Sequence, residues 1–319
     1  MEALALRKAQ NEFRAPIDIS DLVIDERTVS RYRLNYGLGS DIDANHVVQH
    51  LELEYRLTRR LLESSPETRW KTFYECYTTL YKELPWLNLP RKDSIIKPEF
   101  IAWSSLIGPE SKRIFEIGSG QAKLIRYLLS IGHSCVATEI TPERGSKHLN
   151  QQDGLIWHNT DGVHLAEFEE GQTYDFVIST QLIEHLHPDD LLEHFRNTKL
   201  ILKPGGEYIF DTPHRGAGPH DLSAVFNLDR PAFMHLREYT FIELAAALRA
   251  AGYKEVRAIF ARSAERPHRS ALYLQYCILW DRLLSIIRLG PRMENFVRSS
   301  WKVRTKLLVP RNIWLSATA

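Results

Sequence analysis

A glycine-rich turn is the clearest candidate for a ligand-binding site in the sequence. Gly118 and Gly120 follow directly on the apolar run 113–117 and precede a stretch with helical spacing. Glycines at such a turn let the backbone approach a ligand closely, and the following helix offers free N–H groups at its start. Lys123 stands where a dinucleotide-binding fingerprint would have its third glycine. The turn therefore predicts a ligand site and counts against a nicotinamide-dependent oxidoreductase.

Acidic residues end the next two apolar runs. Glu139 closes the run 134–139, and Asp161 follows the run 154–159. Ligands of open parallel sheets bind outside the carboxyl ends of the strands, so these side chains would meet in one crevice. A carboxylate at the second strand tip can accept hydrogen bonds from both ribose hydroxyls of a nucleoside. The spacing therefore predicts that a nucleoside binds across this edge of the sheet.

Histidines gather after the fourth and fifth apolar runs and are candidates for a catalytic base. We assign this role to His185, His214 and His235, each of which follows a strand or lies in the connection before the next helix. A positioned histidine can accelerate a reaction that needs proton transfer by about 10²–10⁴-fold. The structural alternative is that Glu184 and His185 cap a helix and pair with neighbours, with no catalytic part.

Short apolar runs separated by helical lengths must position these residues. The runs are apolar on both faces, as strands covered by helices on both sides must be. They occupy residues 113–118, 134–140, 154–159, 174–180, 206–213, 253–261 and 312–319. The alternation of strand and helix predicts an α/β fold with a doubly wound, Rossmann-like, seven-stranded sheet.

The stretches on either side of this core have a different texture. Residues 1–105 repeat apolar side chains at spacings of three and four and predict a helical N-terminal extension before the core at 106–264. A helical, basic insertion at 265–306 precedes the last strand at 307–319. We expect the aromatic stripe of the extension to pack against a neighbouring domain rather than to bind a ligand; its members are Trp70, Phe73, Tyr74, Tyr77 and Tyr81.

Together with the later runs YDFVISTQLIEHL and LKPGGEYIFDTP, the turn and the acidic strand ends resemble the class I S-adenosylmethionine-dependent methyltransferases. The resemblance covers about residues 110–262 and the last strand, and it implies S-adenosylmethionine as cofactor and S-adenosylhomocysteine as product. Ala122 stands where the family usually has a third glycine, so we expect retained binding with a slightly displaced loop. The cofactor-binding residues that the resemblance implies are Glu116, Gly118, Ser119 and Gly120 at the methionine end, Glu139 at the ribose, Ile140, Asp161 and Gly162 at the adenine, and Ser179, Thr180 and Gln181 near the sulfonium.

Methyl transfer from a sulfonium is an in-line displacement, so most of the rate comes from holding nucleophile, methyl carbon and sulfur collinear. The helical extension and the insertion are additions to the minimal fold, and we expect them to cover the acceptor pocket. We favour methylation of an oxygen in a small-molecule or sugar-containing biosynthetic intermediate. The partner would then be a small-molecule or glycan-type acceptor.

Two other functions remain open. The pattern Gln181-x-x-Glu184-His185 resembles the E-x-x-E-H of metal-assisted RNA 2′-O-methyltransferases, but the neutral Gln181 is a poor ligand for a hard cation. We therefore assign no metal ligand. The alternative from a different class is a non-catalytic scaffold or sensor that binds the nucleoside. Glu139 and Asp161 argue against it, because a sheet does not need acids at those tips for stability.

The composition restricts the partners and the compartment. The 319 residues carry a net charge of +1, so we expect no nucleic-acid partner. Three separated cysteines argue against a disulfide framework or a thiolate zinc site and favour a reducing, cytoplasmic location. No apolar stretch is long enough to span a membrane. Between Asp281 and Arg311 eight basic residues stand against two acidic ones, so peripheral membrane contact through 271–306 is an alternative to a solvated helical face.

Overall fold

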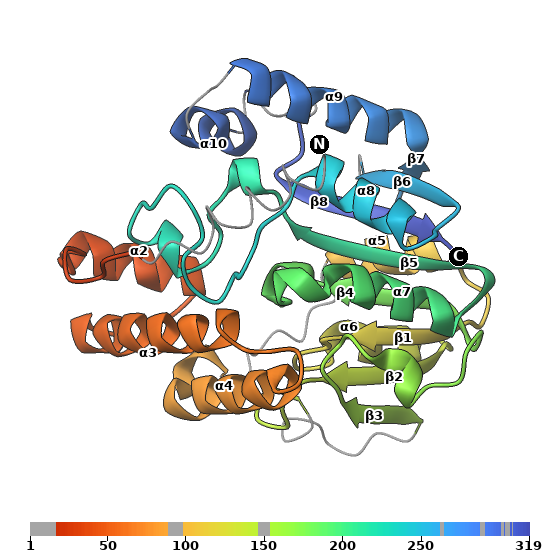
Figure 1. Ribbon diagram of the computed structural model, residues 1–319, viewed down its shortest axis with the longest axis horizontal. Helices are drawn as coiled ribbons and strands as arrows, with labels where there is room; N and C mark the ends of the chain where they lie inside the picture. The colour runs from red at the N-terminus through yellow and green to blue at the C-terminus, as the bar shows by residue number, and fades with distance from the viewer. Residues whose placement is uncertain are drawn as a thin grey trace.

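The described residues of this computed structural model, 17–88, 98–145, 154–261, 265–287, 291–300, 303, 307 and 309–319, form an eight-stranded sheet flanked by helices (Figure 1). The strand order is β3-β2-β1-β4-β5-β8-β6-β7. Strands β1 to β5 lie parallel to their neighbours, whereas β8 lies antiparallel between β5 and β6. This arrangement confirms the predicted Rossmann-like α/β fold.

All seven apolar runs form strands. Their bounds are β1 (Arg113–Ile117), β2 (Ser134–Glu139), β3 (Leu155–Asn159), β4 (Tyr174–Thr180), β5 (Leu202–Pro213), β6 (Glu255–Ala261) and β8 (Asn312–Thr318). A further strand, β7 (Pro267–Ser270), pairs antiparallel with β6 at the edge of the sheet. The sequence predicts only helix in that segment, because the four residues Pro-His-Arg-Ser carry no alternation of apolar and polar side chains.

Helices cover both faces of the sheet. Alternate side chains of one strand point to opposite faces, and in β1 Phe115 joins one buried cluster while Ile114 joins the other. The first cluster includes side chains of α7 (Leu191–Ile201), α8 (Phe241–Ala250) and α9 (Ala271–Ile287). The second includes side chains of α5 (Pro98–Ile107) and α6 (Lys123–Ser130). The core therefore has the two layers of helices that strands apolar on both faces require.

Three helices of the N-terminal extension, α2 (Glu26–Tyr36), α3 (Ala44–Leu62) and α4 (Arg69–Glu83), gather at one end of the sheet (Figure 1). Asp25 and Asp43 begin α2 and α3, because each carboxylate accepts hydrogen bonds from N–H groups of the first turn. Apolar side chains of α3 and α4 pack against Met234 and Leu236 in the connection after β5. The extension is helical, as its periodicity predicts, while the division into domains stays a prediction.

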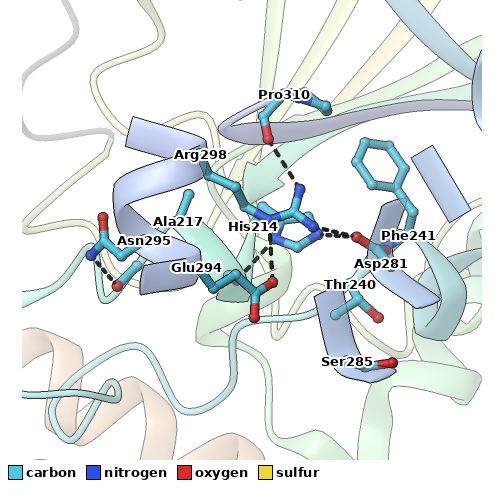
Figure 2. A network of polar contacts seen from close by, with 12 residues as sticks. His214, Ala217, Thr240, Phe241, Asp281, Ser285, Glu294, Asn295, Arg298 and Pro310 are labelled. Atoms are coloured by element: carbon cyan, nitrogen blue, oxygen red, sulfur yellow. Dashed lines mark hydrogen bonds and ion pairs between the residues drawn. The ribbon is translucent and has the colours of Figure 1, made fainter. Parts of the chain in front are cut away.

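A buried ion network fastens α9 and α10 (Pro291–Ser299) to the end of β5 (Figure 2). Nη2 of Arg298 donates to Oδ1 of Asp281 at 2.6 Å, and Nε2 of His214 lies 2.9 Å from the same oxygen. The main-chain N–H of Phe241 donates to the other carboxylate oxygen at 2.9 Å. These bonds join the end of β5 and the start of α8 (Phe241–Ala250) to α9 and α10. None of the helices among the described residues is long and apolar enough to cross a membrane.

Candidate functional site

A cavity of 780 Å³ lies where the parallel strands β1, β2 and β4 end. Most residues assigned from the sequence line its walls: Glu116, Gly118, Ser119, Gly120, Glu139, Ile140, Asp161, Gly162, Thr180, Gln181 and His185. Ser179, His214 and His235 do not line it. The fold thus brings the glycine turn, both acidic strand ends and one candidate base to a single place.

The glycine turn packs closely against Leu182 at Gly118. Its backbone has φ +68°, and a Cβ added there would come within 2.9 Å of the Leu182 side chain. Gly120 and Ala122 are also left-handed, with φ of 56° and 55°. Ala122 occupies the position of the missing third glycine at the start of α6, a conformation that costs an L-residue about 1–2 kcal/mol. Whether the loop is displaced relative to turns with a third glycine stays a prediction.

Glu139 ties the second strand tip to the glycine turn. The N–H of Gly120 donates to Oε2 of Glu139 at 2.8 Å, and the N–H of Ile140 donates to Oε1 at 2.9 Å. Burial raises the pKa of Glu139, although these bonds oppose the shift. Each carboxylate oxygen can accept more than one hydrogen bond, so Glu139 can also accept from ligand hydroxyls while it keeps these main-chain donors.

Asp161 caps the turn after β3. Its Oδ1 accepts hydrogen bonds from the N–H groups of Val163 at 2.8 Å and His164 at 2.9 Å, and its Oδ2 lies 2.5 Å from Nδ1 of His164. These local bonds hold the carboxylate in place at the cavity wall. The same residue therefore serves the turn and faces the ligand space.

Two buried carboxyl groups of the cavity each have an oxygen without a hydrogen-bond partner among the described residues, Oε2 of Glu116 and Oδ1 of Asp211. Burial raises the pKa of Glu116 to about 7, against the hydrogen bond from Ser119. Burial raises the pKa of Asp211 to about 6, against the bond that Gln181 donates at 2.6 Å. Such oxygens need a donor or a cation from a ligand.

Asp211 was not assigned from the sequence. It ends the apolar part of β5 and lines the cavity beside the tips of β1 and β4. The rule that selects Glu139 and Asp161, an acid at the carboxyl end of a strand, would also have selected Asp211.

His185 is the one candidate base that faces the cavity. Its Nδ1 lies 2.9 Å from the carbonyl oxygen of Met234, and because a carbonyl only accepts, Nδ1 carries the proton. Burial, together with the charge of His235, lowers the pKa of His185 to about 3. The side chain is therefore a neutral imidazole whose Nε2 keeps its lone pair.

His235 touches His185 but carries a proton of its own. The ring centroids lie 4.8 Å apart, and Nδ1 of His235 lies 2.9 Å from Oε1 of Glu238. Burial opposes the charge of His235, but Glu238, Glu184 and Asp221 outweigh it and raise its pKa to about 9. At neutral pH this imidazolium has no lone pair with which to accept a proton.

Glu184, His185 and His235 form a cluster that could hold a metal ion. One ligand atom from each lies within 4.8 Å of the others. Nδ1 of each histidine is engaged by Met234 or Glu238, and Oε2 of Glu184 accepts a hydrogen bond from Thr212 at 2.9 Å. Such outer bonds orient metal ligands, and here they leave Nε2 of His185 and Oε1 of Glu184 available. Nε2 of His235 becomes a ligand only when the bound metal displaces its proton. The sequence assigned no metal ligand, because the neutral Gln181 stands where the metal-assisted enzymes have an acid.

His214 and Ser179 are buried away from the cavity. The N–H of Gly216 donates to Nδ1 of His214 at 2.9 Å, so Nε2 holds the proton and donates it to Asp281. His214 thus belongs to the network that anchors α9 and α10 (Figure 2). The hydroxyl of Ser179 lies 2.8 Å from that of Tyr208 in the core. Proximity to a strand tip in sequence does not decide to which side of the tip a side chain turns.

Part of the aromatic stripe of α4 lines the cavity, although we expected it to serve packing. Phe73 and Tyr77 are buried in the cluster between α3 and α4, yet both reach the cavity wall together with Tyr81. Trp70 and Tyr74 are partly exposed instead. A stripe at helical spacing looks the same whether it meets a core or a ligand space, so the sequence held no signal for the difference.

A family model described as a methyltransferase domain matches residues 96–258, just over half of the chain. Among solved structures, an S-adenosylmethionine-dependent methyltransferase from Mesorhizobium loti matches with 14% identity and a TM-score of 0.45, over 68% of this chain and 95% of that one. A methyltransferase from Archaeoglobus fulgidus matches with 13% identity and a TM-score of 0.46, over 70% and 95%. The 1,6-didemethyltoxoflavin-N1-methyltransferase of Burkholderia thailandensis matches with 14% identity and a TM-score of 0.48, over 80% and 90%. The comparison with curated protein sequences finds no match.

The matched segment and the cavity coincide. Residues 96–258 contain β1 to β5 and with them the glycine turn and the acidic strand ends. The sequence pattern, the sheet order and the family match all lead to one assignment. The chain belongs to the methyltransferase-domain family and is a class I enzyme that uses S-adenosylmethionine.

Proposed function

We propose that this enzyme methylates an oxygen of a small-molecule or sugar-containing acceptor and that His185 accepts the proton of the attacking hydroxyl. The position of His185 is the observation that supports this most. The residue lines the cofactor cavity and also a second chamber of 400 Å³ whose walls come largely from the N-terminal helices. A base at the junction of the two spaces is placed to meet the acceptor where it approaches the cofactor.

The chemistry of the large cavity supports the cofactor assignments. Glu139 would accept the ribose hydroxyls and Asp161 the adenine amino group, with Ile140 against the ring. The unpartnered oxygen of Glu116 suits the methionine end, whose ammonium group donates hydrogen bonds. The remaining residues of the proposed wall are Gly118, Ser119, Gly120, Gly162, Thr180 and Gln181. S-adenosylmethionine supplies a methyl carbon on a positive sulfonium, and several carboxyl groups favour that charge.

His185 would act late in the reaction. A hydroxyl oxygen becomes strongly acidic as it gains the methyl group, so even a base with a low pKa can take its proton. Nδ1 of His185 donates its proton to the carbonyl oxygen of Met234, and this hydrogen bond orients the ring. The lone pair of Nε2 then points away from Met234. The protonated His235 beside it lowers the basicity of His185 and so keeps it unprotonated before the acceptor binds.

The test follows labelled methyl groups from S-adenosylmethionine into a small-molecule extract. We expect label in O-methyl products for the wild type and for His158→Gln, a partly exposed histidine outside the cavity. In His185→Gln the rate should fall by about 10²–10⁴-fold while S-adenosylhomocysteine still binds. A full rate in His185→Gln would remove the proposed base. Label confined to RNA or protein would contradict the acceptor class.

One observation favours a second, metal-assisted function: the cluster of Glu184, His185 and His235 with its outer hydrogen bonds. A metal ion there would occupy the lone pair of His185 and polarise the acceptor hydroxyl itself. Melting curves with Mn²⁺ after chelation would separate the two mechanisms. Stabilisation in the wild type but not in Glu184→Gln, with activity restored by Mn²⁺, would favour the metal. Unchanged activity in chelator would favour the free base. An RNA acceptor would in addition make binding fall steeply with salt.

The cytoplasmic location and the lack of a nucleic-acid partner remain proposals. Cys76, Cys135 and Cys277 are all buried free thiols, which suits a reducing compartment. Fractionation of cells that produce the protein would test the location, and loss of the soluble-fraction signal would contradict it.

A further inference from the structure

Acidic and aromatic side chains line the chamber beside the cofactor cavity. Its residues come from α2, the turn after it, α3, α4 and the connection after β5, and they enclose 400 Å³. It shares Tyr77, Tyr81, Leu87, Arg144 and His185 with the cofactor cavity, so the two spaces adjoin at these side chains. Any acceptor that approaches His185 from this side must contact these walls.

Glu54 of α3 lines the chamber with a buried side chain. The residue is only 6% exposed, and its Oε1 is paired with Nε2 of His50 at 2.7 Å. Its Oε2 is buried and has no hydrogen-bond partner in the described part of the chain. A buried carboxylate oxygen without a donor is costly, so a hydrogen-bond donor from a ligand would repair this defect.

Tyr77 adds a second unsatisfied group. Its hydroxyl is buried and lacks a partner among the described residues. Burial raises its pKa well above the ordinary value, so the hydroxyl stays protonated and can both donate and accept. Tyr36, Tyr81 and Trp86 line the same chamber and give it aromatic walls.

The charges of the chamber disfavour an anion. Glu54 and Asp41 line it, and the guanidinium of Arg144 is already engaged, with Nη1 donating to Oδ1 of Asn88 at 3.0 Å and Cζ lying 5.1 Å from the centre of the Tyr81 ring. A carboxylate or phosphate placed near Glu54 would meet like charge in a poorly solvated space.

We propose that this chamber selects a non-anionic ring compound that donates a hydrogen bond to Oε2 of Glu54, from either a hydroxyl or an ammonium group. The inference rests on the proposed function, because it takes the chamber as the place of the methyl acceptor. Glu54 and Tyr77 hold the ring at its non-reacting groups, and the reacting group then lies toward His185.

The experiment uses the full chain loaded with S-adenosylhomocysteine and measures saturation transfer by NMR to three probes. Methyl α-glucoside tests a neutral polyol, glucosamine an ammonium-bearing polyol, and glucuronate an anionic one. We expect signals from the first two and none from glucuronate. Signal from the glucoside alone identifies hydroxyl donation, and signal from glucosamine alone identifies the ammonium group.

Glu54→Gln should weaken the binding of these probes by about tenfold or more, because it replaces an acceptor of charge-assisted bonds by an amide. Glu52→Gln, an exposed residue of the same helix, is the matched control and should leave binding unchanged. Tyr77→Phe should also weaken the binding of these probes. It provides an independent test if Glu54→Gln unfolds at a lower temperature than the wild type.

Equal binding of glucuronate, full binding in both Glu54→Gln and Tyr77→Phe, or no signal from any probe would overturn the inference. Calorimetry with S-adenosylhomocysteine is run on the same samples. Failure of that ligand to bind would overturn the cofactor assignments instead, so the two failures are distinguishable.

Discussion

Buried carboxyl groups make cofactor binding depend on pH at the scale of single residues. Burial raises the pKa of Glu116 to about 7 and that of Asp211 to about 6, while a cationic ligand favours their ionised forms. We expect the affinity for S-adenosylmethionine to rise between about pH 5.5 and about pH 8, by up to about tenfold per unit for each group below its pKa. Calorimetry across this range measures the slope.

The variant Glu116→Gln isolates one of these groups. It should flatten the part of the profile near pH 7 and leave the part near pH 6 that Asp211 controls. The stability of the ligand-free wild type has the opposite pH dependence. Between the pKa of an unfolded glutamate and about pH 7, folded Glu116 keeps a proton that the unfolded chain has released, so the contribution of Glu116 to the unfolding free energy falls as pH rises. A wild-type affinity independent of pH would contradict the proposed contact with the ligand's positive groups.

Gly118 offers a second prediction at the residue scale. Gly118→Ala should weaken S-adenosylhomocysteine binding, because the added Cβ lies 2.9 Å from Cδ1 of Leu182 and displaces this side chain, which lines the same cavity. Gly108→Ala is the matched control, since Gly108 also has a positive φ, of +90°, but open space around its Cβ position. Both variants should lose about 1–2 kcal/mol of stability from backbone strain. Equal affinity in the two variants would exclude the turn from the site.

At the scale of elements, the network of His214, Asp281 and Arg298 decides how α9 and α10 attach to the sheet (Figure 2). Arg298→Met should lower the unfolding free energy by about 3–5 kcal/mol, because it removes the arginine partner of the buried Asp281 and leaves it only His214 and the N–H of Phe241 among the described residues. Arg282→Met, an exposed residue of α9, should stay within about 0.5 kcal/mol of the wild type. Urea unfolding compares the three proteins.

The same network has a pH signature. Burial opposes the charge of Asp281, but His214 and Arg298 outweigh it and lower its pKa. Its stabilisation is therefore present above the pKa of an unfolded aspartate and is lost as pH falls through the folded pKa. An acid unfolding midpoint that is the same in Arg298→Met and the wild type would contradict this role.

At the scale of the whole molecule, α9 and α10 expose an apolar face. Leu272, Leu279 and Ile286 are 84%, 62% and 76% exposed on α9, and Phe296 is 58% exposed on α10. Arg298 forms ion pairs with Asp281 and Glu294, the two acids of the basic segment 281–311. These acids therefore do not neutralise the other basic residues of the segment. The sequence predicts peripheral contact of this segment with an anionic membrane, and this stays a prediction. Exposed apolar side chains beside basic residues are typical of such contacts.

Co-sedimentation with lipid vesicles tests that prediction. The protein should pellet with phosphatidylcholine vesicles that contain phosphatidylglycerol, and less so as salt is raised. Leu279→Ser with Ile286→Ser should reduce the pelleted fraction severalfold, whereas Leu200→Ser on α7 should not. No pelleting of the wild type with anionic vesicles would contradict membrane contact.

The sequence predicted most of the fold because strands buried on both faces are recorded in local composition. The runs at β1, β2 and β4 needed no knowledge of distant residues, and neither did the glycine turn that ends β1. The edge strand β7 escaped because it is short, polar and held only by β6. Asp211 was predictable from the sequence, because it is an acid near the carboxyl end of a strand, as Glu139 and Asp161 are.

The sequence by itself determined the cofactor side of this protein. Glu116, Gly118 and Glu139 lie within one β-turn-α-β unit, so their spacing along the chain decides their spacing in space. The docking of distant helices had to be seen before the residues that line the adjoining chamber, where we propose that the acceptor binds, could be named. Whether His185 or His214 faces the ligand, and whether Tyr77 packs or lines a chamber, depends on helices that dock from far along the chain. Those contacts form between residues whose separation in sequence carries no record of them.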